Sequence, residues 1–408
     1  MHTHNLVIVY GVDSQIGLCI VRELGKKGCR VIAIGKSEDS IGLSSRYVYE
    51  RHVIPNALTE SEKVTRLNRI NSQNQPINLL CISESDILFF NRVKSQLENI
   101  IPLVPSSVEM NKVLNKSVTI GAAERVGILT PKSISIDKLE DINSHLDSLE
   151  FPVVLKWSNP LAVIKEAAKA GIRIEKLLYI YNSNQLIETL KRYSILRHYP
   201  LIQEYISGYG LGQFFFMHDG ECLLRFQHRR LHEWPPEGGY SSLCESTPLQ
   251  QHSALQNQSI ALLKTLNWSG VAMVEYRYDE AKNTAVLMEI NGRFWGSYPL
   301  AYHSNALFAW YTYKILGLGE SPESEPISPN IRCRNLLVEL KRLNRIFFHS
   351  KLIQDKSIEF SRLKTLLSVT LGFFDFRMRY YLFSLDDLKP VISDMKNVLK
   401  KITLNFRS

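Results

Sequence analysis

The chain has 408 residues, which is too long for one ordinary domain and suggests two to four packed units. Hydrophobic residues make up 45% and charged residues 22%, so wholesale disorder and a fibrous repeat are excluded. The net charge of +9 lies entirely in residues 331–408, and a neutral body with a basic tail argues against a nucleic-acid enzyme.

No apolar run reaches about 18 residues, so we expect no transmembrane segment. The first five residues lack the basic region and cleavage site of a signal peptide. The six cysteines form no CxxC pair, which is typical of free thiols in a reducing compartment. These features predict a cytoplasmic protein.

Residues 5–112 alternate short apolar runs with amphipathic stretches. The runs at 6–10, 30–34 and 77–82 read as strands, and residues 15–27 read as a helix. This alternation predicts a doubly wound parallel sheet.

The glycine-containing turn from Gly11 to Gly17, after the first predicted strand, resembles the turn of dinucleotide-binding domains. However, the GxGxxG spacing is absent, and the second strand ends in Ile34-Gly35-Lys36 without the acidic residue that binds the NAD ribose. The sequence therefore favours a tight turn into a helix over an NAD site.

The middle of the chain changes pattern twice. Residues 113–200 predict helices at 112–126 and 137–149, a strand at 152–156 and a charged segment at 164–176. Residues 201–300 predict an antiparallel, β-rich unit. Its expected strands are 201–206, 213–218, 222–227, 271–277 and 284–290, with a helix at 249–266.

Two of these strands predict a hairpin that holds an acidic pair. The polar turn at 279–283 places Glu275 opposite Glu289, on one face of the sheet. Two opposed carboxylates repel each other, so such a pair usually needs a cation. The alternative is that both glutamates face solvent on an edge hairpin.

Asn291 and Arg293 fall on the same side of that strand, because side chains alternate. Carboxylate and amide oxygens suit Mg²⁺, with Mn²⁺ as a second option. The sequence therefore predicts a metal site formed by Glu275, Glu289 and Asn291.

Four segments in order resemble the ATP-grasp enzymes, and the resemblance spans residues 5–315. Within these enzymes, the segments most resemble the carboxylate–amine ligases of the biotin carboxylase and carbamoyl-phosphate synthetase type. The segments are Asn115-Lys116 with the loop at 127–131, the strand 151–156, the segment 201–208 and Glu289-Ile290-Asn291-Gly292-Arg293.

The resemblance implies a role for each matching residue. Lys116 and Lys156 would contact the phosphates of ATP, and Arg293 would steady an acyl-phosphate. The hinge residues Gln203, Glu204 and Ile206 would contact the adenine. Glu275, Glu289 and Asn291 would hold one or two Mg²⁺ ions.

A basic stretch at 226–239 follows the hinge. Its two histidines lack the further ligands that a zinc site needs. We expect Arg230, or else Arg229, to bind a carboxylate or phosphate, since alternation sends the two to opposite faces.

The chain departs from the family pattern in three places. Ser158-Asn159-Pro160-Leu161 replaces a glycine-rich lid, Gln213 is the one candidate for the ribose contact, and Gly292 stands where Pro is usual.

The resemblance implies an ATP-dependent ligase that joins a small-molecule carboxylate to an amine and releases ADP and phosphate. The alternatives are a non-catalytic nucleotide-binding sensor or scaffold and a ligase whose nucleophile is not an amine. Glu84, Tyr298 and His303 are candidates for the acceptor pocket.

The implied architecture is α/β: a pre-ATP-grasp domain (1–112), a small lobe (113–200), a large lobe (201–318) and a basic helical region (319–408). The apolar residues of the last region predict that it packs on the core or on a second subunit. Its cations predict peripheral contact with an acidic surface.

Overall fold

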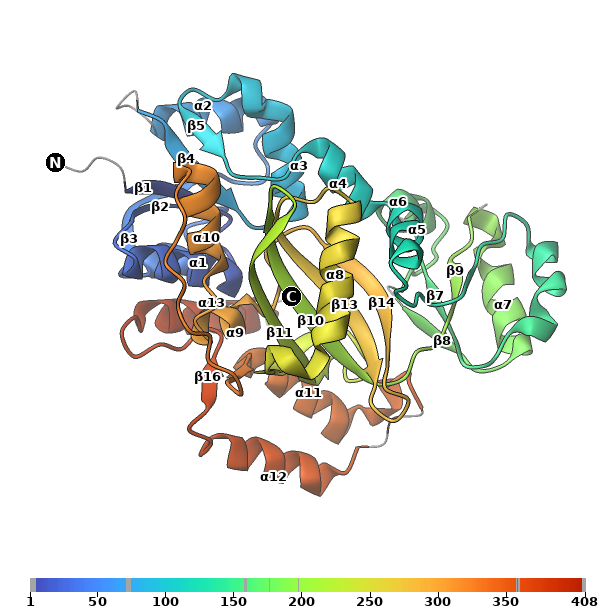
Figure 1. Ribbon diagram of the computed structural model, residues 1–408. Coiled ribbons are helices and arrows are strands. Elements are labelled where there is room, and N and C mark those ends of the chain that lie inside the picture. The colour runs from blue at the N-terminus through green and yellow to red at the C-terminus, as the bar shows by residue number, and fades with distance from the viewer. Residues whose placement is uncertain are drawn as a thin grey trace.

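The computed structural model describes residues 5–70, 75–157, 160–175, 177–196, 198–356, 358 and 360–405. In these ranges three sheets of five, four and seven strands organise the chain. Figure 1 shows the N-terminal sheet on the left, the large sheet in the centre and the small lobe on the right. None of the helices in these ranges has the length and hydropathy that a membrane crossing requires.

The N-terminal domain is the predicted doubly wound parallel sheet, in the order β3-β2-β1-β4-β5. Val7 and Val9 pack in the cluster that includes α1, whereas Ile8 and Tyr10 pack in the cluster that includes α2 and α3. Both faces are therefore covered, which explains the uninterrupted apolar strands. The elements are β1 (Leu6–Tyr10), α1 (Gln15–Lys26), β2 (Arg30–Gly35), η1 (Ile41–Ser44), β3 (Val48–Val53), α2 (Glu60–Ile70), β4 (Ile77–Cys81), α3 (Glu84–Val93), η2 (Lys94–Gln96) and β5 (Ile100–Pro102).

The small lobe departs from two predictions. The expected helix at 112–126 is two helices, because the side chain of Asn115 accepts hydrogen bonds from the N–H groups of Ser117 and Val118 and starts a new helix there. The expected helix at 137–149 is only two short 3₁₀ turns, η3 (Leu139–Ser144) and η4 (Leu146–Ser148).

The elements of residues 107–204 include a four-stranded sheet in the order β6-β9-β7-β8, and the two helices at 107–125 pack on the large sheet rather than on this one. The elements are α4 (Ser107–Leu114), α5 (Lys116–Arg125), β6 (Ser133–Ile134), β7 (Val153–Lys156), α6 (Pro160–Lys169), β8 (Leu178–Ile180), α7 (Ser183–Tyr193), η5 (Ser194–Leu196) and β9 (Leu201–Glu204).

The large sheet has the order β14-β13-β10-β11-β12-β15-β16. Helix α8 packs on one face, and the aromatic cluster around Phe214 and Trp295 covers part of the other. The elements are β10 (Tyr209–His218), β11 (Glu221–Trp234), β12 (Tyr240–Ser246), η6 (Leu249–His252), α8 (Ser253–Thr265), β13 (Gly270–Asp279), β14 (Thr284–Asn291), α9 (Tyr298–His303), α10 (Phe308–Tyr311) and η7 (Thr312–Gly317).

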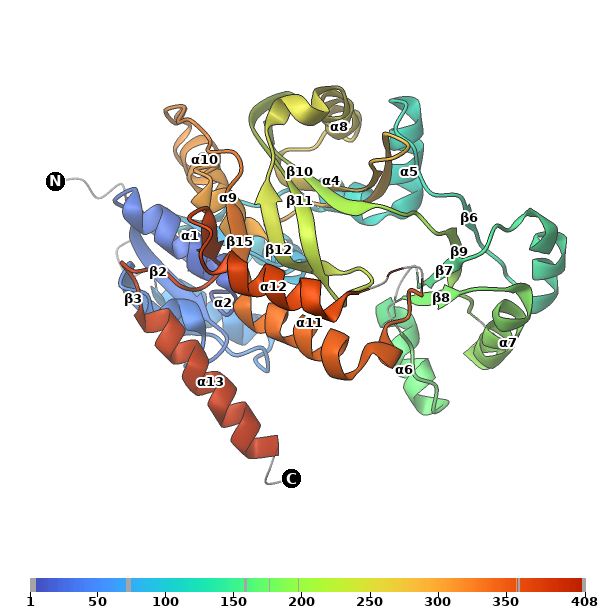
Figure 2. The same cartoon turned by 90° about the horizontal axis from the view of Figure 1, so that it is seen from below.

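The C-terminal region is helical as predicted, but it also adds two short strands to the large sheet. Strand β15 (Arg332–Arg334) pairs with β12, and β16 (Met378–Tyr380) pairs with β15. The helices are α11 (Leu336–Phe348), α12 (Arg362–Gly372) and α13 (Lys389–Asn405), with a 3₁₀ turn η8 (Ser350–Leu352). Figure 2, seen from below, shows these helices across the facing side of the molecule.

Polar contacts hold this region on the core, whereas many of the apolar residues from which its packing was predicted, among them Leu340, Phe374 and Phe376, are exposed. Nε of Arg22 in α1 lies 2.9 Å from Oδ2 of Asp387, and both side chains are fully buried. On the large lobe, Nδ1 of His232 lies 2.7 Å from Oε1 of Glu339 in α11.

Candidate active site

The acidic pair forms as the hairpin predicted. Glu275 of β13 lies directly opposite Glu289 of β14, with Met273 opposite Asn291 further along the ladder. A bulge after Glu275 shifts the pairing nearer the turn, so that Tyr276 faces Leu287. Burial raises the pKa of Glu275, and Glu289 raises it too, whereas Arg230 lowers it.

Arg230 of β11 holds Glu275 and a second carboxylate. Its Nη2 donates to Oε2 of Glu275 at 2.6 Å, and its Nη1 donates to Oε1 of Glu233 at 3.1 Å and to the carbonyl of Gly239 at 2.7 Å. Burial alone would lower the pKa of Arg230, but the two glutamates raise it above its ordinary value. Its Nε is buried and has no hydrogen-bond partner among the described residues.

Arg229 lies on the other face of the sheet, as alternation required. Its Nε and Nη2 donate to Oε2 of Glu245 at 3.0 and 2.8 Å. Arg332 from β15 shares this carboxylate at 2.8 Å. Arg229 therefore belongs to the attachment of the C-terminal region, and its prediction as a catalytic residue is wrong.

Asn291 and Arg293 form a short chain of contacts. Nδ2 of Asn291 donates to Oε1 of Glu289 at 3.0 Å, and its Oδ1 accepts from Nη2 of Arg293 at 2.8 Å. Nε of Arg293 lies 3.2 Å from Oε1 of Glu84, the first residue of α3. The N-terminal domain thus contributes a carboxylate that contacts Arg293, and the place of Glu84 in an acceptor pocket stays a prediction.

Two lysines lie near the acidic pair or near each other. Lys156 ends β7, and Lys116 begins α5 behind its Asn115 cap. Burial and, to a smaller extent, Lys116 lower the pKa of Lys156 to about 8, while Glu289 and Glu275 oppose the shift. Lys156 therefore lies within electrostatic range of Lys116 and of both glutamates of the large sheet.

The hinge between the lobes lies at 205–208, between β9 of the small sheet and β10 of the large sheet. Nε2 of Gln203 donates to Oγ of Ser133 at 3.1 Å, and Oε2 of exposed Glu204 accepts from the Lys132 N–H at 3.1 Å. Ile206 is half-buried. The adenine contacts of Gln203, Glu204 and Ile206 stay predictions.

Gln213 cannot make the predicted ribose contact. It is fully buried on the face opposite Glu275, where its Oε1 accepts from Oγ of Ser259 in α8 at 2.7 Å. The prediction is wrong because the residue that lies opposite Glu275 on β10 is Gly212, and the next side chain points the other way.

Two of the predicted acceptor residues form polar contacts with other elements. The fully buried hydroxyl of Tyr298 donates to Glu23 of α1 and accepts from the Ala309 N–H. Nε2 of His303 lies 3.2 Å from the Tyr380 carbonyl. Buried Tyr298 therefore serves the packing of α9, whereas the place of half-buried His303 in an acceptor pocket stays a prediction.

The site contains two charged residues that the sequence analysis missed. Nη2 of Arg277 lies 3.1 Å from Oε2 of Glu233, and its Nη1 donates to the hinge carbonyl of Gly208 at 3.0 Å. Arg277 follows Glu275 by two residues. Because side chains two apart on a strand share a face, the sequence already placed Arg277 beside Glu275. Glu233 could not be found, since bulges in β11 bring it to the face of Arg230.

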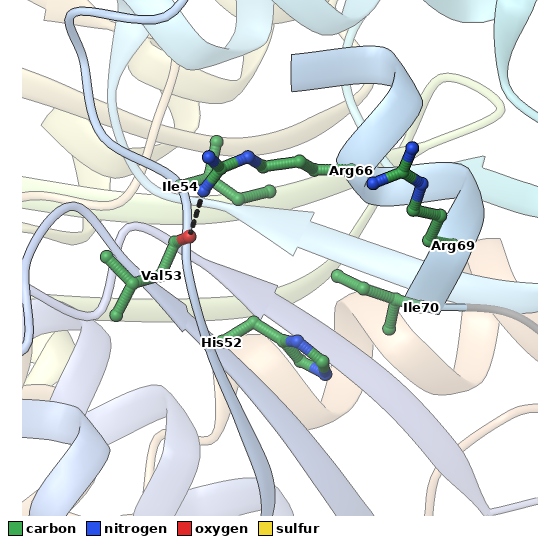
Figure 3. A pocket seen from close by; sticks show the side chains of 6 residues that line it. All are labelled: His52, Val53, Ile54, Arg66, Arg69 and Ile70. Atoms are coloured by element: carbon green, nitrogen blue, oxygen red, sulfur yellow. Dashed lines mark hydrogen bonds between the residues drawn. The ribbon is translucent and has the colours of Figure 1, made fainter. Parts of the chain in front are cut away.

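Two cavities lie away from this cluster. One of about 240 Å³ in the N-terminal domain is lined by His52, Arg66, Arg69 and three apolar residues (Figure 3). The other, of about 380 Å³, lies between the 127–129 segment and the start of β14. Neither contains a predicted site residue. Ser158 and Asn159, at the predicted lid, lie outside the described residues.

The oxygens of Glu275, Glu289 and Asn291 fit a magnesium ion chemically. Among the described residues, no three or more His, Cys, Asp and Glu side chains are placed to hold a metal. Water and phosphate oxygens would therefore complete the ligand shell, which is usual for Mg²⁺.

Comparisons with known proteins point to one fold. No family model matches the chain. It is 23% identical to urea amidolyase of Saccharomyces cerevisiae over 192 residues, or 44% of this chain, and it spans only about a tenth of that relative's length.

Solved structures match over much more of the chain. The biotin carboxylase of Campylobacter jejuni superposes with a TM-score of 0.62 at 15% identity, covering 80% of this chain and 74% of that one. The N5-carboxyaminoimidazole synthetase of Staphylococcus aureus superposes with a TM-score of 0.58 at 12% identity, covering 81% and 82%. The chain therefore has the ATP-grasp fold, in the arrangement found in biotin carboxylases and N5-carboxyaminoimidazole synthetases.

Proposed function

We propose that the chain is an ATP-dependent ligase that activates a substrate carboxylate and joins it to an amine. The observation that carries the proposal is the meeting of two lobes at one charged cluster. Lys156 of the small lobe and Lys116 of α5 lie within electrostatic range of each other, and Lys156 lies within range of Glu275 and Glu289 of the large lobe. Phosphate transfer needs this combination of cations and metal-binding oxygens.

In the proposed reaction a carboxylate oxygen attacks the γ-phosphorus of ATP, and ADP leaves. The amine nitrogen then attacks the acyl carbon of the acyl-phosphate, loses a proton and expels phosphate. Lys116 and Lys156 neutralise phosphate oxygens, and Arg293 stabilises the acyl-phosphate. Arg230, which holds Glu275 and Glu233, adds positive charge for the substrate carboxylate.

Glu275, Glu289 and Asn291 would hold Mg²⁺, with Mn²⁺ as an alternative ion. The ion, when bound, neutralises charge on the β- and γ-phosphates. Arg230 and Arg293 already hold Glu275 and Asn291 in place, at 2.6 and 2.8 Å. The protein therefore orients these oxygens before any ligand binds.

The substrates we propose are small molecules. Bicarbonate is one candidate carboxylate, since it is named with MgADP in the Hydrogenobacter thermophilus 2-oxoglutarate carboxylase structure, which is also a dimer. A homo-oligomer is accordingly part of the proposal. The free cysteines, of which five are buried, support placing the reaction in the cytoplasm.

The test is a screen that measures ADP release with Mg²⁺ over many pairs of carboxylates, including bicarbonate, and amines. Glu289→Gln should lose at least about a hundredfold in turnover, because the carboxyl shape remains but its charge does not. Arg230→Lys should also lose turnover, since a single ammonium cannot bridge Glu275 and Glu233. Arg229→Lys is the matched control on the opposite face and should keep turnover.

Two outcomes would replace the proposal. ATP binding without ADP release for any pair would favour the non-catalytic sensor, which the existing Arg230–Glu275 and Arg293–Asn291 contacts also allow. ADP release that requires a carboxylate but ignores the amine would favour a ligase with another nucleophile. Wild-type turnover in Glu289→Gln would refute the metal assignment.

A further inference from the structure

Helix α12 turns its apolar side to solvent. The stripe consists of Leu363, Leu366, Leu367 and Leu371, which are 67%, 51%, 50% and 65% exposed. Their spacing of three and four residues puts them on one helical face. A helix on the surface of a soluble domain normally turns such a stripe inward, whereas no described residue covers this face.

The turn after α12 extends the apolar surface. Phe374 and Phe376 are 83% and 87% exposed, the highest values for large apolar side chains in the described chain. They belong to the 373–376 turn that leads into β16. Together the stripe and these two rings are called the α12 face below.

The outward orientation of the α12 face is fixed by packing on its other side. A Cβ atom at Gly372 would lie 2.2 Å from Nη2 of buried Arg334, so a larger residue there would require the guanidinium to move. Nη1 of Arg334 also donates to the Val369 carbonyl at 3.3 Å. Val369 and Gly372 are the buried residues of the helix, which leaves the leucines outside.

The charge beside the α12 face is positive. Arg362 and Lys364 of α12 form no ion pair with any described residue, and Arg379 donates only to backbone carbonyls. No acidic residue occurs from 362 to 374. Asp375 is already neutralised by Arg332 and Arg377 at 3.1 Å each.

We propose that the α12 face docks on an anionic lipid bilayer. Its leucines and phenylalanines would enter the boundary between headgroups and acyl chains, and Arg362, Lys364 and Arg379 would bind lipid phosphates. Figure 1 shows α12 at the lower edge of the molecule, and Figure 2, seen from below, shows it on the side that faces the viewer.

A second copy of the chain fits this face less well. A twofold contact would place the same patch against itself. The unpaired cations of both copies would then face each other across a desolvated contact, which disfavours the pair. An anionic surface satisfies the same cations.

The test is sedimentation of the full-length protein with vesicles of phosphatidylcholine alone or mixed with phosphatidylserine. Binding should require the anionic lipid, and it should fall at least about tenfold between about 0.1 M and about 1 M salt, because the Debye length shrinks from ~10 to ~3 Å. Leu363→Ser/Leu371→Ser should lower affinity at least about tenfold.

Matched controls distinguish binding through the α12 face from nonspecific binding by other apolar or basic residues. Val108 and Ile195 are 66% and 67% exposed on other elements, so Val108→Ser/Ile195→Ser should bind as wild type does. Arg362→Gln/Lys364→Gln should weaken binding, whereas Arg66→Gln/Arg69→Gln, which removes equal charge from the N-terminal domain, should not.

Three results would overturn the proposal. The first is no binding to anionic vesicles at low salt, which would leave an acidic protein as the partner. The second is equal binding to neutral vesicles. The third is light scattering that shows a dimer in wild type and a monomer in Leu363→Ser/Leu371→Ser, which would assign the face to self-association.

Discussion

Glu23 is a carboxylate buried between α1 and α10, away from the charged cluster. It is 1% exposed, and it accepts hydrogen bonds from the Trp310 N–H at 2.8 Å and from the Tyr298 hydroxyl. Burial raises its pKa to about 7, and the hydrogen bonds oppose part of that rise. The folded protein therefore holds a proton there that the unfolded chain releases near pH 4.5.

This shift predicts a pH-dependent stability. Between about pH 4.5 and 7 the folded state binds more protons than the unfolded chain does. The contribution of Glu23 to the free energy of unfolding therefore falls as the pH rises and is lost above about pH 7. Glu23→Gln is neutral at every pH. Between about pH 4.5 and 7, its free energy of unfolding should rise relative to that of wild type by up to roughly 3 kcal/mol. Denaturant unfolding at several pH values measures the difference.

The control is Glu98→Gln, which removes an exposed carboxylate. Parallel stability curves for wild type and Glu23→Gln would show that Glu23 stays charged in the folded protein.

The residues predicted correctly at the site depend on local rules. The polar turn at 279–283 fixes the register that brings Glu275 opposite Glu289. Gln213 and Tyr298 were misplaced because their surroundings come from α8 and α1, which are distant in the chain. Nothing near them in sequence indicates those partners.

At the scale of elements, β10 makes room for the charged cluster. A Cβ atom at Gly210 would lie 2.6 Å from Cδ of Arg230, so a side chain there would displace the guanidinium that holds Glu275.

Gly210→Ala should therefore reduce turnover by at least about tenfold, because Arg230 loses its geometry toward Glu275. Gly121→Ala is the control, since no atom lies within 4 Å of its added Cβ and α5 should gain roughly 0.5–1 kcal/mol. Turnover and melting temperature separate the two effects, and equal turnover in Gly210→Ala and wild type would contradict this role of Gly210.

Periodicity predicted the buried elements better than the polar ones. The strands 6–10 and 271–277 are apolar and were found within a few residues of their ends. Strands β12 and β15 were missed because their sequences, Tyr240–Ser246 and Arg332–Arg334, are mostly polar and pair across a long separation. The helix predicted at 137–149 failed where polar residues favour short turns.

For the whole molecule, the contact of Asp387 with the N-terminal domain joins the two ends of the chain. Oδ2 of Asp387 accepts from Arg22 at 2.9 Å and from Oγ of Ser45 at 2.7 Å, and its Oδ1 accepts from the Arg46 N–H at 2.9 Å.

Asp387→Ala should lower the free energy of unfolding by about 3–5 kcal/mol, because it leaves Arg22 buried without a counter-charge. The neighbouring Asp386 pairs with Lys26 at 2.9 Å near the surface, where the two side chains are 38% and 42% exposed. Asp386→Ala should lower the free energy of unfolding much less, by about 1 kcal/mol. Urea unfolding of both variants measures the difference, and similar losses would mean that burial of the Arg22 pair adds nothing.

The Arg22–Asp387 contact also sets an order of events during synthesis. The two residues are separated by 365 positions. At roughly 5–20 residues per second, a ribosome needs on the order of 20–70 s to deliver the partner of Arg22. Through that time the newly made N-terminal sheet exists with an unpaired guanidinium at its surface, so the first domain to emerge is among the last to be completed.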